Sequence, residues 1–296
     1  MKKVIIAGST GFVGKYLIKR FKSLRYNIVT ISRSDADITW ENKSGIKEAL
    51  EDTDLLINLA GKSVNCRYNE KNKAEIFSSR TETTETLGNA ILQCQNPPKL
   101  WINASTATIY RHSLDRPMTE NNGEIGTGFS VEVAQKWEKS FFDFQVQNTR
   151  QVALRMAIVL GADGGVMTPF ENLVKFGLGG KQGNGKQMFS WIHIEDIFQI
   201  IQFVESEKDI KGVINCSAPA PVTNEDFMRT FREVKKIPIG LPSSTWMLKI
   251  GAFIIGTETE LLLKSRWVIP EKLLDYKYEF QFPTINRALS DIIHSR

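Results

Sequence analysis

Three glycines spaced three residues apart near the start of the chain have the types and spacing of an anion-binding turn. Gly8, Gly11 and Gly14 follow the apolar run Val4–Ala7 directly, and a helix-patterned segment comes next. Glycine permits a tight turn at the first position, close backbone approach to phosphates at the second, and close helix–strand packing at the third. Phosphates there would meet unpaired N–H groups and the positive end of a helix. The pattern therefore predicts a cradle for a dinucleotide pyrophosphate.

The end of the next predicted strand indicates which dinucleotide fits. In the NAD-binding arrangement an acidic residue stands about 20 positions past the glycines and binds the adenosine ribose. This chain instead carries Arg33 after the strand-like run Asn27–Ser32. A guanidinium pairs with a 2′-phosphate, which an acid would repel. We expect NADP(H) rather than NAD(H); the alternatives are that Arg33 is simply solvated or that nearby Asp35 points inward.

Two hydroxyl residues follow the later strand-like run Leu100–Ala104. Thr106, with Ser105 beside it, is expected where that strand ends, facing the nicotinamide. A pair of this kind is as typical of a simple cap at a strand exit. Tyr110 is a candidate proton donor if it points into the cleft, and a core aromatic residue if it does not.

The elements that position these residues alternate between strand and helix patterns, which is typical of an α/β fold with a doubly wound parallel sheet of the Rossmann type. Strands are expected at Val4–Ala7, Asn27–Ser32, Asp37–Trp40, Asp54–Leu59, Leu100–Ala104 and Val213–Asn215, with Gln151–Leu160 as a strand and its exit, and helices are expected at Phe12–Leu24, about residues 71–94, and Val131–Phe144. We expect a nucleotide-binding domain over residues 1–218 and a small, mostly helical C-terminal lobe over residues 219–296. Glycine-rich loops at 161–165 and 177–185, within an insertion around 161–192, are expected to shape a substrate cleft.

Composition excludes several classes of protein. The 296 residues are 42% hydrophobic and 24% charged, as in ordinary globular proteins. The net charge of +5 is scattered, so we expect no nucleic-acid partner. Cys66, Cys94 and Cys216 lack metal-ligand spacing, and their odd number predicts a reducing compartment. With no signal-peptide pattern, and with Trp246–Ile255 interpreted as a core-facing helix, we expect a cytoplasmic protein without a membrane partner.

Longer motifs resemble those of the extended short-chain dehydrogenase/reductase superfamily. The glycine turn, Asn58-Leu59-Ala60-Gly61 and the segment Ala104–Tyr110 carry this resemblance. More narrowly, the chain resembles the atypical "epimerase family", whose members carry a C-terminal extension of unknown role. The segments that support it are Ser79–Thr84, Gln135–Glu138, Leu178–Gln187, Ser190–Asp196, Val268–Leu274 and Phe280–Pro283. The resemblance implies a Rossmann-type domain that binds a nicotinamide dinucleotide, usually phosphorylated, and a lobe that closes over a small substrate.

One part of the superfamily pattern is missing. Typical members carry Tyr-x-x-x-Lys on the helix after the hydroxyl residue, where the Lys lowers the pKa of the Tyr. Alignment on Trp137 places Ser130 and Ala134 at these two positions, and Lys136 and Lys139 lie on other faces of the predicted helix. The proton donor is therefore unassigned.

Other residues are candidates for the substrate side. His193 is titratable, with packing or capping as its alternative, and Asp196 is expected to cap the following helix. Arg80 and Arg155 are candidates to bind an anionic substrate or the cofactor phosphates, unless they form structural ion pairs. Trp191 belongs to the Gln187–Trp191 stretch that a substrate pocket would need.

Two hypotheses follow, and they place the sites on the same residues. The first is an NADP(H)-dependent oxidoreductase or epimerase-like enzyme for a small molecule, monomeric or homodimeric. The second is an NADP(H)-bound sensor without turnover. The expected catalytic residues are Thr106, Ser105 and Tyr110; the expected cofactor contacts are Gly8, Thr10, Gly11, Phe12, Val13, Gly14, Arg33, Asn58, Leu59, Ala60, Gly61 and Ser105; the expected substrate contacts are Arg80, Arg155, Trp191 and His193; no metal is expected.

Overall fold

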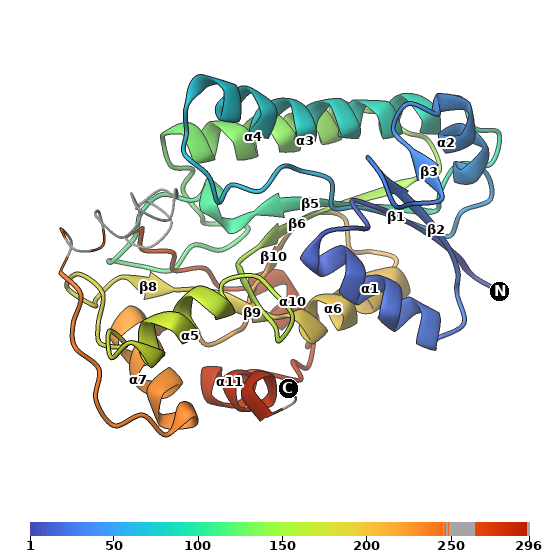
Figure 1. Ribbon diagram of the computed structural model, residues 1–296. Coiled ribbons are helices and arrows are strands. Elements are labelled where there is room, and N and C mark those ends of the chain that lie inside the picture. Colours follow the sequence, from blue (N-terminus) through green and yellow to red (C-terminus); the bar gives the residue numbers. More distant parts are fainter. Residues whose placement is uncertain (245, 247, 249–263, 295–296) are drawn as a thin grey trace.

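A computed structural model of the protein shows a seven-stranded parallel sheet at its centre (Figure 1). The structure describes residues 1–244, 246, 248 and 264–294. The sheet has the strand order β10-β6-β5-β4-β1-β2-β3, so the chain reverses direction across the sheet between β1 and β4. The strands are β1 (Lys3–Ala7), β2 (Asn27–Ser32), β3 (Ile38–Thr39), β4 (Leu55–Asn58), β5 (Leu100–Thr106), β6 (Arg150–Met156) and β10 (Gly212–Cys216). The predicted α/β doubly wound class is confirmed.

Helices cover both faces of this sheet because successive strand side chains point to opposite faces. Val4 and Ile6 pack toward one face, with α1 (Phe12–Ser23), α6 (Ile194–Ser206) and α10 (Glu271–Asp275). Ile5 and Ala7 pack toward the other, with α2 (Lys43–Leu50), α3 (Glu70–Ile91) and α4 (Phe129–Phe142). Strands that are apolar at every position are thereby buried on both sides.

A second core lies below the carboxyl ends of the strands. It is built from α5 (Met167–Lys175), β8 (Met188–Phe189), β9 (Trp191–His193), β11 (Val222–Thr223), α7 (Asn224–Lys235) and α11 (Ile285–His294). Its apolar side chains come from both sides of residue 218; Trp191 and Phe170 pack with Phe227 and Leu289. The predicted domain boundary at residue 218 stays a prediction, and it falls within this shared core.

The structure divides one predicted strand segment in two, and it does not describe most of one predicted helix. The predicted strand Gln151–Leu160 is split at Ala157, and its second half, β7 (Ile158–Leu160), leaves the main sheet to pair with β9. The break occurs because Ala157 N–H donates to the Cys216 carbonyl, whereas Ile158 N–H donates to that of Ser190. The helix predicted over 246–255 lies outside the described residues, apart from 246 and 248. No helix among the described residues is long and apolar enough to cross a bilayer.

Candidate nucleotide-binding site

The turn between β1 and α1 accepts only glycine at two of its three predicted positions. Gly8 has φ +80°, and a β-carbon there would lie 2.7 Å from the carbonyl carbon of Leu59. A β-carbon at Gly14 would lie 2.5 Å from the Gly8 carbonyl oxygen. The turn therefore interlocks with the exit of β4, as close helix–strand packing requires.

The start of α1 is open toward solvent. Gly11 is the N-cap residue, with no side-chain cap, and the first turn of the helix carries no acid. A β-carbon at Gly11 would meet only the Gly8 carbonyl oxygen, at 3.4 Å. Uncapped N–H groups and the helix dipole at this end favour an anion. The observed turn thus fits the predicted pyrophosphate cradle.

A glycine-rich loop lies against the same end of α1. β-carbons at Gly161, Gly164 and Gly165 would each approach the ring of Phe12 to about 3 Å. Phe12 is therefore held between its own helix and the 161–165 loop, which brings that loop to the edge of the cradle. The other glycine-rich loop, 177–185, pairs instead with residues 241–243 through backbone hydrogen bonds. Its predicted part in a substrate cleft stays a prediction.

Arg33 follows the end of β2, and its side chain is exposed; its role at a 2′-phosphate stays a prediction. The hydroxyl of the preceding residue, Ser32, lies 3.2 Å from the hydroxyl of Thr10. This contact joins the end of the strand to the glycine turn. The hydrogen bond from Lys62 lowers the pKa of Glu75 on α3, and the charge of Arg33 contributes weakly to the same shift. Nearby Asp35, in a left-handed turn, accepts a hydrogen bond from the neighbouring serine.

The side chain of Asn58 shapes the exit of β4. Its amide donates to the Asn103 side-chain oxygen (2.7 Å) and to the Thr84 hydroxyl (3.2 Å), and its own oxygen accepts the Ala60 N–H. Asn58 is fully buried. These bonds fix the backbone of Ala60 and Gly61, so a ligand at this exit would meet backbone rather than the Asn58 side chain.

Arg80 places a positive charge beside that exit. A β-carbon at Gly61 would lie 3.1 Å from the central guanidinium carbon of Arg80. The guanidinium donates to the Ile76 carbonyl (2.9 Å) and stacks 5.0 Å from the ring centre of Trp137. Burial lowers the pKa of Arg80 to about 10, so the side chain stays charged at neutral pH. No carboxylate of the described part of the chain forms an ion pair with it.

At the exit of β5, four buried side chains and Ser105 form a continuous hydrogen-bonded network. Ser105 donates to Glu138 (2.5 Å), and Arg155 grips both oxygens of that carboxylate, at 2.8 and 2.7 Å. Arg155 also donates to the Tyr110 hydroxyl, which in turn donates to the Asn215 side-chain oxygen, both at 2.9 Å. All five side chains are buried.

In this network Arg155 and Tyr110 have the structural roles that were the alternatives to their predicted roles in the site. Arg155 is in an ion pair with Glu138 rather than open to a substrate, and Tyr110 is a core aromatic residue whose pKa is raised by burial. Sequence reasoning missed Glu138. Glu138 lies four residues after Ala134 and eight after Ser130, so all three share one helix face. A carboxylate on the face where Tyr and Lys are missing was the signal that could have identified Glu138.

Thr106 keeps a partly exposed position where β5 ends. Its hydroxyl accepts the N–H of Thr108 (3.2 Å) and so caps the short 3₁₀ turn Ala107–Ile109. Lys264 and Arg266, from the C-terminal part of the chain, donate to the carbonyl and hydroxyl of Thr108. The C-terminal segment therefore contacts the 3₁₀ turn that the Thr106 hydroxyl caps.

Trp191 and His193 lie in the interior. Trp191 is fully buried and donates to the Ala220 carbonyl, so we no longer assign it to the substrate. His193 is the N-cap of α6, where its Nδ1 accepts the Glu195 N–H at 3.2 Å. Asp196 does not cap this helix, contrary to the prediction, because α6 already begins at Ile194. Its carboxylate instead accepts the N–H groups of Gln281 and Phe282.

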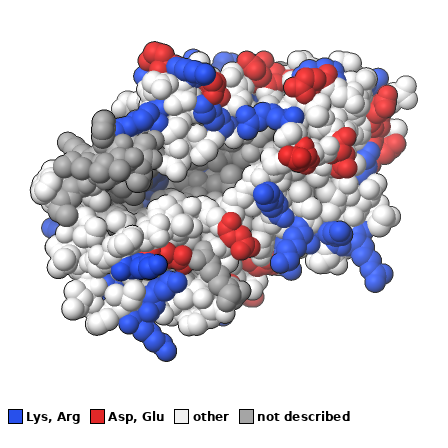
Figure 2. Space-filling view, in the orientation of Figure 1, with Lys and Arg blue, Asp and Glu red and all other residues white. Residues whose placement is uncertain are grey.

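A groove crosses the molecule between its upper helical layer and its lower lobe (Figure 2). Lys and Arg side chains gather along the upper rim of this groove in the view shown. The described residues contain no cluster of three or more His, Cys, Asp or Glu side chains with metal-binding geometry.

Comparison with known proteins shows the family to which the chain belongs. Residues 4–131 match the NAD dependent epimerase/dehydratase family, and residues 244–292 match a domain of unknown function, DUF1731. Epimerase family protein SDR39U1 of Mus musculus is 30% identical over 98% of this chain and 99% of its own length. Epimerase family protein SERP0438 of Staphylococcus epidermidis is 32% identical over 99% of both chains. The crystal structure of human SDR39U1 (isoform 2) with NADPH has 30% identity and a TM-score of 0.90, covering 99% of this chain and all of that chain.

The sheet order, the glycine turn and the open helix end define a Rossmann-type dinucleotide-binding fold of the extended short-chain dehydrogenase/reductase kind. With relatives of this identity along the whole chain, the protein belongs to the NAD-dependent epimerase/dehydratase family. The family resemblance predicted from the motifs is confirmed.

Proposed function

We propose that the protein binds NADP(H), with the pyrophosphate on the glycine turn at the start of α1. The observation that carries this proposal is the uncapped helix end behind Gly11, in a turn where side chains at Gly8 and Gly14 would collide with backbone. A relative of the same length and fold was crystallised with NADPH. Arg33 supplies the charge for the 2′-phosphate, and Arg80, beside Gly61, supplies a second cation along the nucleotide.

Arg33→Asp tests this assignment by calorimetry with NADPH and NADH. A lost charge-assisted contact is worth about 1.5–3 kcal/mol, so NADPH affinity should fall about tenfold or more while NADH affinity changes little. Lys22→Asp, an exposed charge reversal on α1, is the control and should leave both affinities unchanged. Equal losses for both nucleotides would remove Arg33 from the phosphate site, and no heat from either nucleotide with wild-type protein would refute the binding proposal.

We further propose that the protein is a cytoplasmic oxidoreductase or epimerase-like enzyme that acts on a small molecule. When bound, the nicotinamide would supply hydride transfer. The chain contributes the partly exposed Thr106 hydroxyl at the end of β5, and its C-terminal part contacts the 3₁₀ turn that this hydroxyl caps. NADPH oxidation with a panel of aldehydes, ketones and nucleotide sugars is the test. We expect turnover of at least one class, and loss of that turnover in Thr106→Val.

One observation favours a second function, an NADP(H)-bound sensor without turnover. Ser105, Tyr110 and Arg155 are all occupied by bonds within the buried network, and Ser130 and Ala134 replace the usual acid/base pair. Asn215 in this network also donates to the Ile269 carbonyl, which connects the exit of β5 to the C-terminal part of the chain. Tight NADPH binding without oxidation across the panel would select this function.

A further inference from the structure

An exposed apolar patch, formed by Phe176, Ile239 and Leu241, lies where two loops of the lower lobe run side by side. These side chains are 75, 68 and 59% exposed. Leu241 N–H donates to the Gly177 carbonyl (2.8 Å), and Gly180 N–H donates to the Leu241 carbonyl (3.0 Å). Large apolar side chains that are both exposed and gathered mark a contact surface.

Backbone contact holds the two loops together as one unit. A β-carbon at Gly180 would lie 2.5 Å from the Leu241 carbonyl carbon, and one at Gly240 would lie 2.7 Å from that of Gly179. Arg232 adds a side-chain bond to the Gly179 carbonyl from α7. The two loops that carry the apolar patch therefore hold each other in place, because their backbones are in direct contact with no side chain between them.

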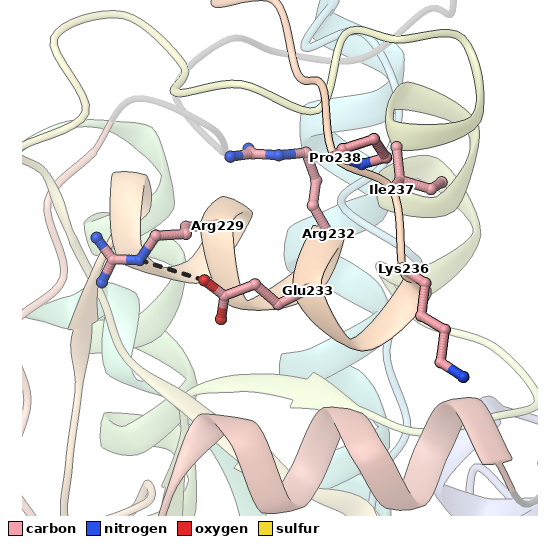
Figure 3. A pocket seen from close by; sticks show the side chains of 6 residues that line it. All are labelled: Arg229, Arg232, Glu233, Lys236, Ile237 and Pro238. Atoms are coloured by element: carbon pink, nitrogen blue, oxygen red, sulfur yellow. Dashed lines mark ion pairs between the residues drawn. The ribbon is translucent and has the colours of Figure 1, made fainter.

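Positive charges surround the apolar patch. Lys175, Lys181 and Lys236 are exposed, and none of them pairs with a carboxylate in the part of the chain that the structure describes. Next to the patch is an open pocket of about 440 Å³ (Figure 3), lined by Arg229, Arg232, Glu233, Lys236, Ile237 and Pro238. Arg229 pairs with Asp226 and Glu233, which leaves the pocket net positive.

We propose that this face binds an anionic phospholipid surface, with the apolar patch entering the headgroup boundary and the lysines and the pocket meeting lipid phosphates. Exposed apolar side chains next to unpaired cations match the two parts of such a surface. A second copy of the chain fits less well, because it would bring like charges together across the contact. The expectation of no membrane partner rested on the lack of a spanning segment, which a peripheral contact does not need. This inference is independent of the nucleotide site.

Vesicle co-sedimentation of the NADPH-loaded protein tests the proposal. The vesicles are phosphatidylcholine alone, or phosphatidylcholine with phosphatidylglycerol, at low and raised salt. We expect binding to the anionic vesicles only, weakened by salt. Leu241→Ser and Lys236→Glu should each lower partition about tenfold. Leu92→Ser and Lys22→Glu are matched controls, since these residues are exposed at the C-terminal ends of α3 and α1, and they should bind like wild type.

Three results would overturn the proposal. The first is wild-type protein that stays in solution with anionic vesicles. The second is unchanged partition of both Leu241→Ser and Lys236→Glu, since folded variants that bind normally exclude this face; NADPH affinity and melting temperature report whether they are folded. The third is a dimer on gel filtration that Leu241→Ser converts to monomer, which would assign the patch to a second copy.

Discussion

At the residue scale, the buried ion pair between Arg155 and Glu138 makes a prediction about the stability of the protein. Arg155→Met leaves the Glu138 carboxylate buried with Ser105 as its remaining partner. An unpaired buried charge typically costs about 3–5 kcal/mol. We therefore expect urea unfolding to show a loss of about 3 kcal/mol or more. The double variant Arg155→Met with Glu138→Leu should recover part of the loss, because no charge is then left unpaired; a single variant as stable as wild type would contradict the buried pair.

His193 predicts how stability depends on pH. Burial lowers the pKa of His193 to about 4, whereas the unfolded chain takes up its proton near 6.5. The unfolded state therefore binds more protons between these values, so the His193 contribution to stability is complete above about pH 6.5 and is lost as the pH falls. At pH 5 the expected loss is about 2 kcal/mol relative to pH 7.5.

His193→Asn isolates this contribution, because Asn also caps helices but does not titrate. The difference in unfolding free energy between wild type and variant should be about 2 kcal/mol smaller at pH 5 than at pH 7.5. Asp196, whose pKa burial raises to about 6, acts in the opposite direction in both proteins and largely cancels in the difference. A difference that is constant from pH 7.5 to 5 would show that His193 titrates normally.

Whether a residue's role could be predicted from the sequence depends on how far away its partners lie along the chain. The glycine turn and the position of Arg33 after β2 were predictable because both depend on neighbours within one strand–helix–strand unit. The network that joins Ser105, Glu138, Arg155, Tyr110 and Asn215 was not, because its bonds connect residues 17 to 105 positions apart. Local patterns therefore identified Tyr110 and Arg155 as chemically capable, whereas only the fold shows that they bind each other.

The turn between β1 and α1 makes a prediction at the scale of an element. Gly11→Ala adds a β-carbon that meets only ordinary contact at 3.4 Å, yet it stands in front of the open helix end. We expect unchanged folding with NADPH affinity reduced at least tenfold. Gly14→Ala would place its β-carbon 2.5 Å from the Gly8 carbonyl oxygen, so we expect a loss of stability as well.

Melting temperature and NADPH calorimetry on both variants separate these effects. If Gly11→Ala binds NADPH like wild type, the phosphates do not lie against the start of α1. If Gly14→Ala melts like wild type, the tight contact between helix and strand is not what fixes the turn.

The boundaries of most elements in the nucleotide-binding part followed from pattern alone, because strands that are buried on both faces are apolar throughout. β2 was predicted with its observed bounds, and α1 to within one residue. The split of β6 from β7 was not predictable, because apolar residues continue through the break. The break depends on which distant carbonyls accept the backbone N–H groups at Ala157 and Ile158.

At the scale of the whole molecule, the second core joins the two predicted parts of the chain. Leu289 on α11 is fully buried in this core, so Leu289→Ala should cost about 3 kcal/mol. Trp191, from the other side of residue 218, packs in the same core, so we expect one cooperative transition. Tryptophan fluorescence and far-ultraviolet circular dichroism should therefore give coincident urea curves. Separate transitions in Leu289→Ala would show instead that residues 219–296 unfold independently.

The stacking of Arg80 on Trp137 has an optical consequence. Trp137 is buried directly behind a guanidinium that borders Gly61, and a nucleotide along this exit would lie on the far side of that charge. Indole emission overlaps the absorption of reduced nicotinamide, so occupancy of the groove should quench this ring by energy transfer. Trp137→Phe should therefore reduce the quenching that NADPH causes, and the quenching that remains would come from the other five tryptophans.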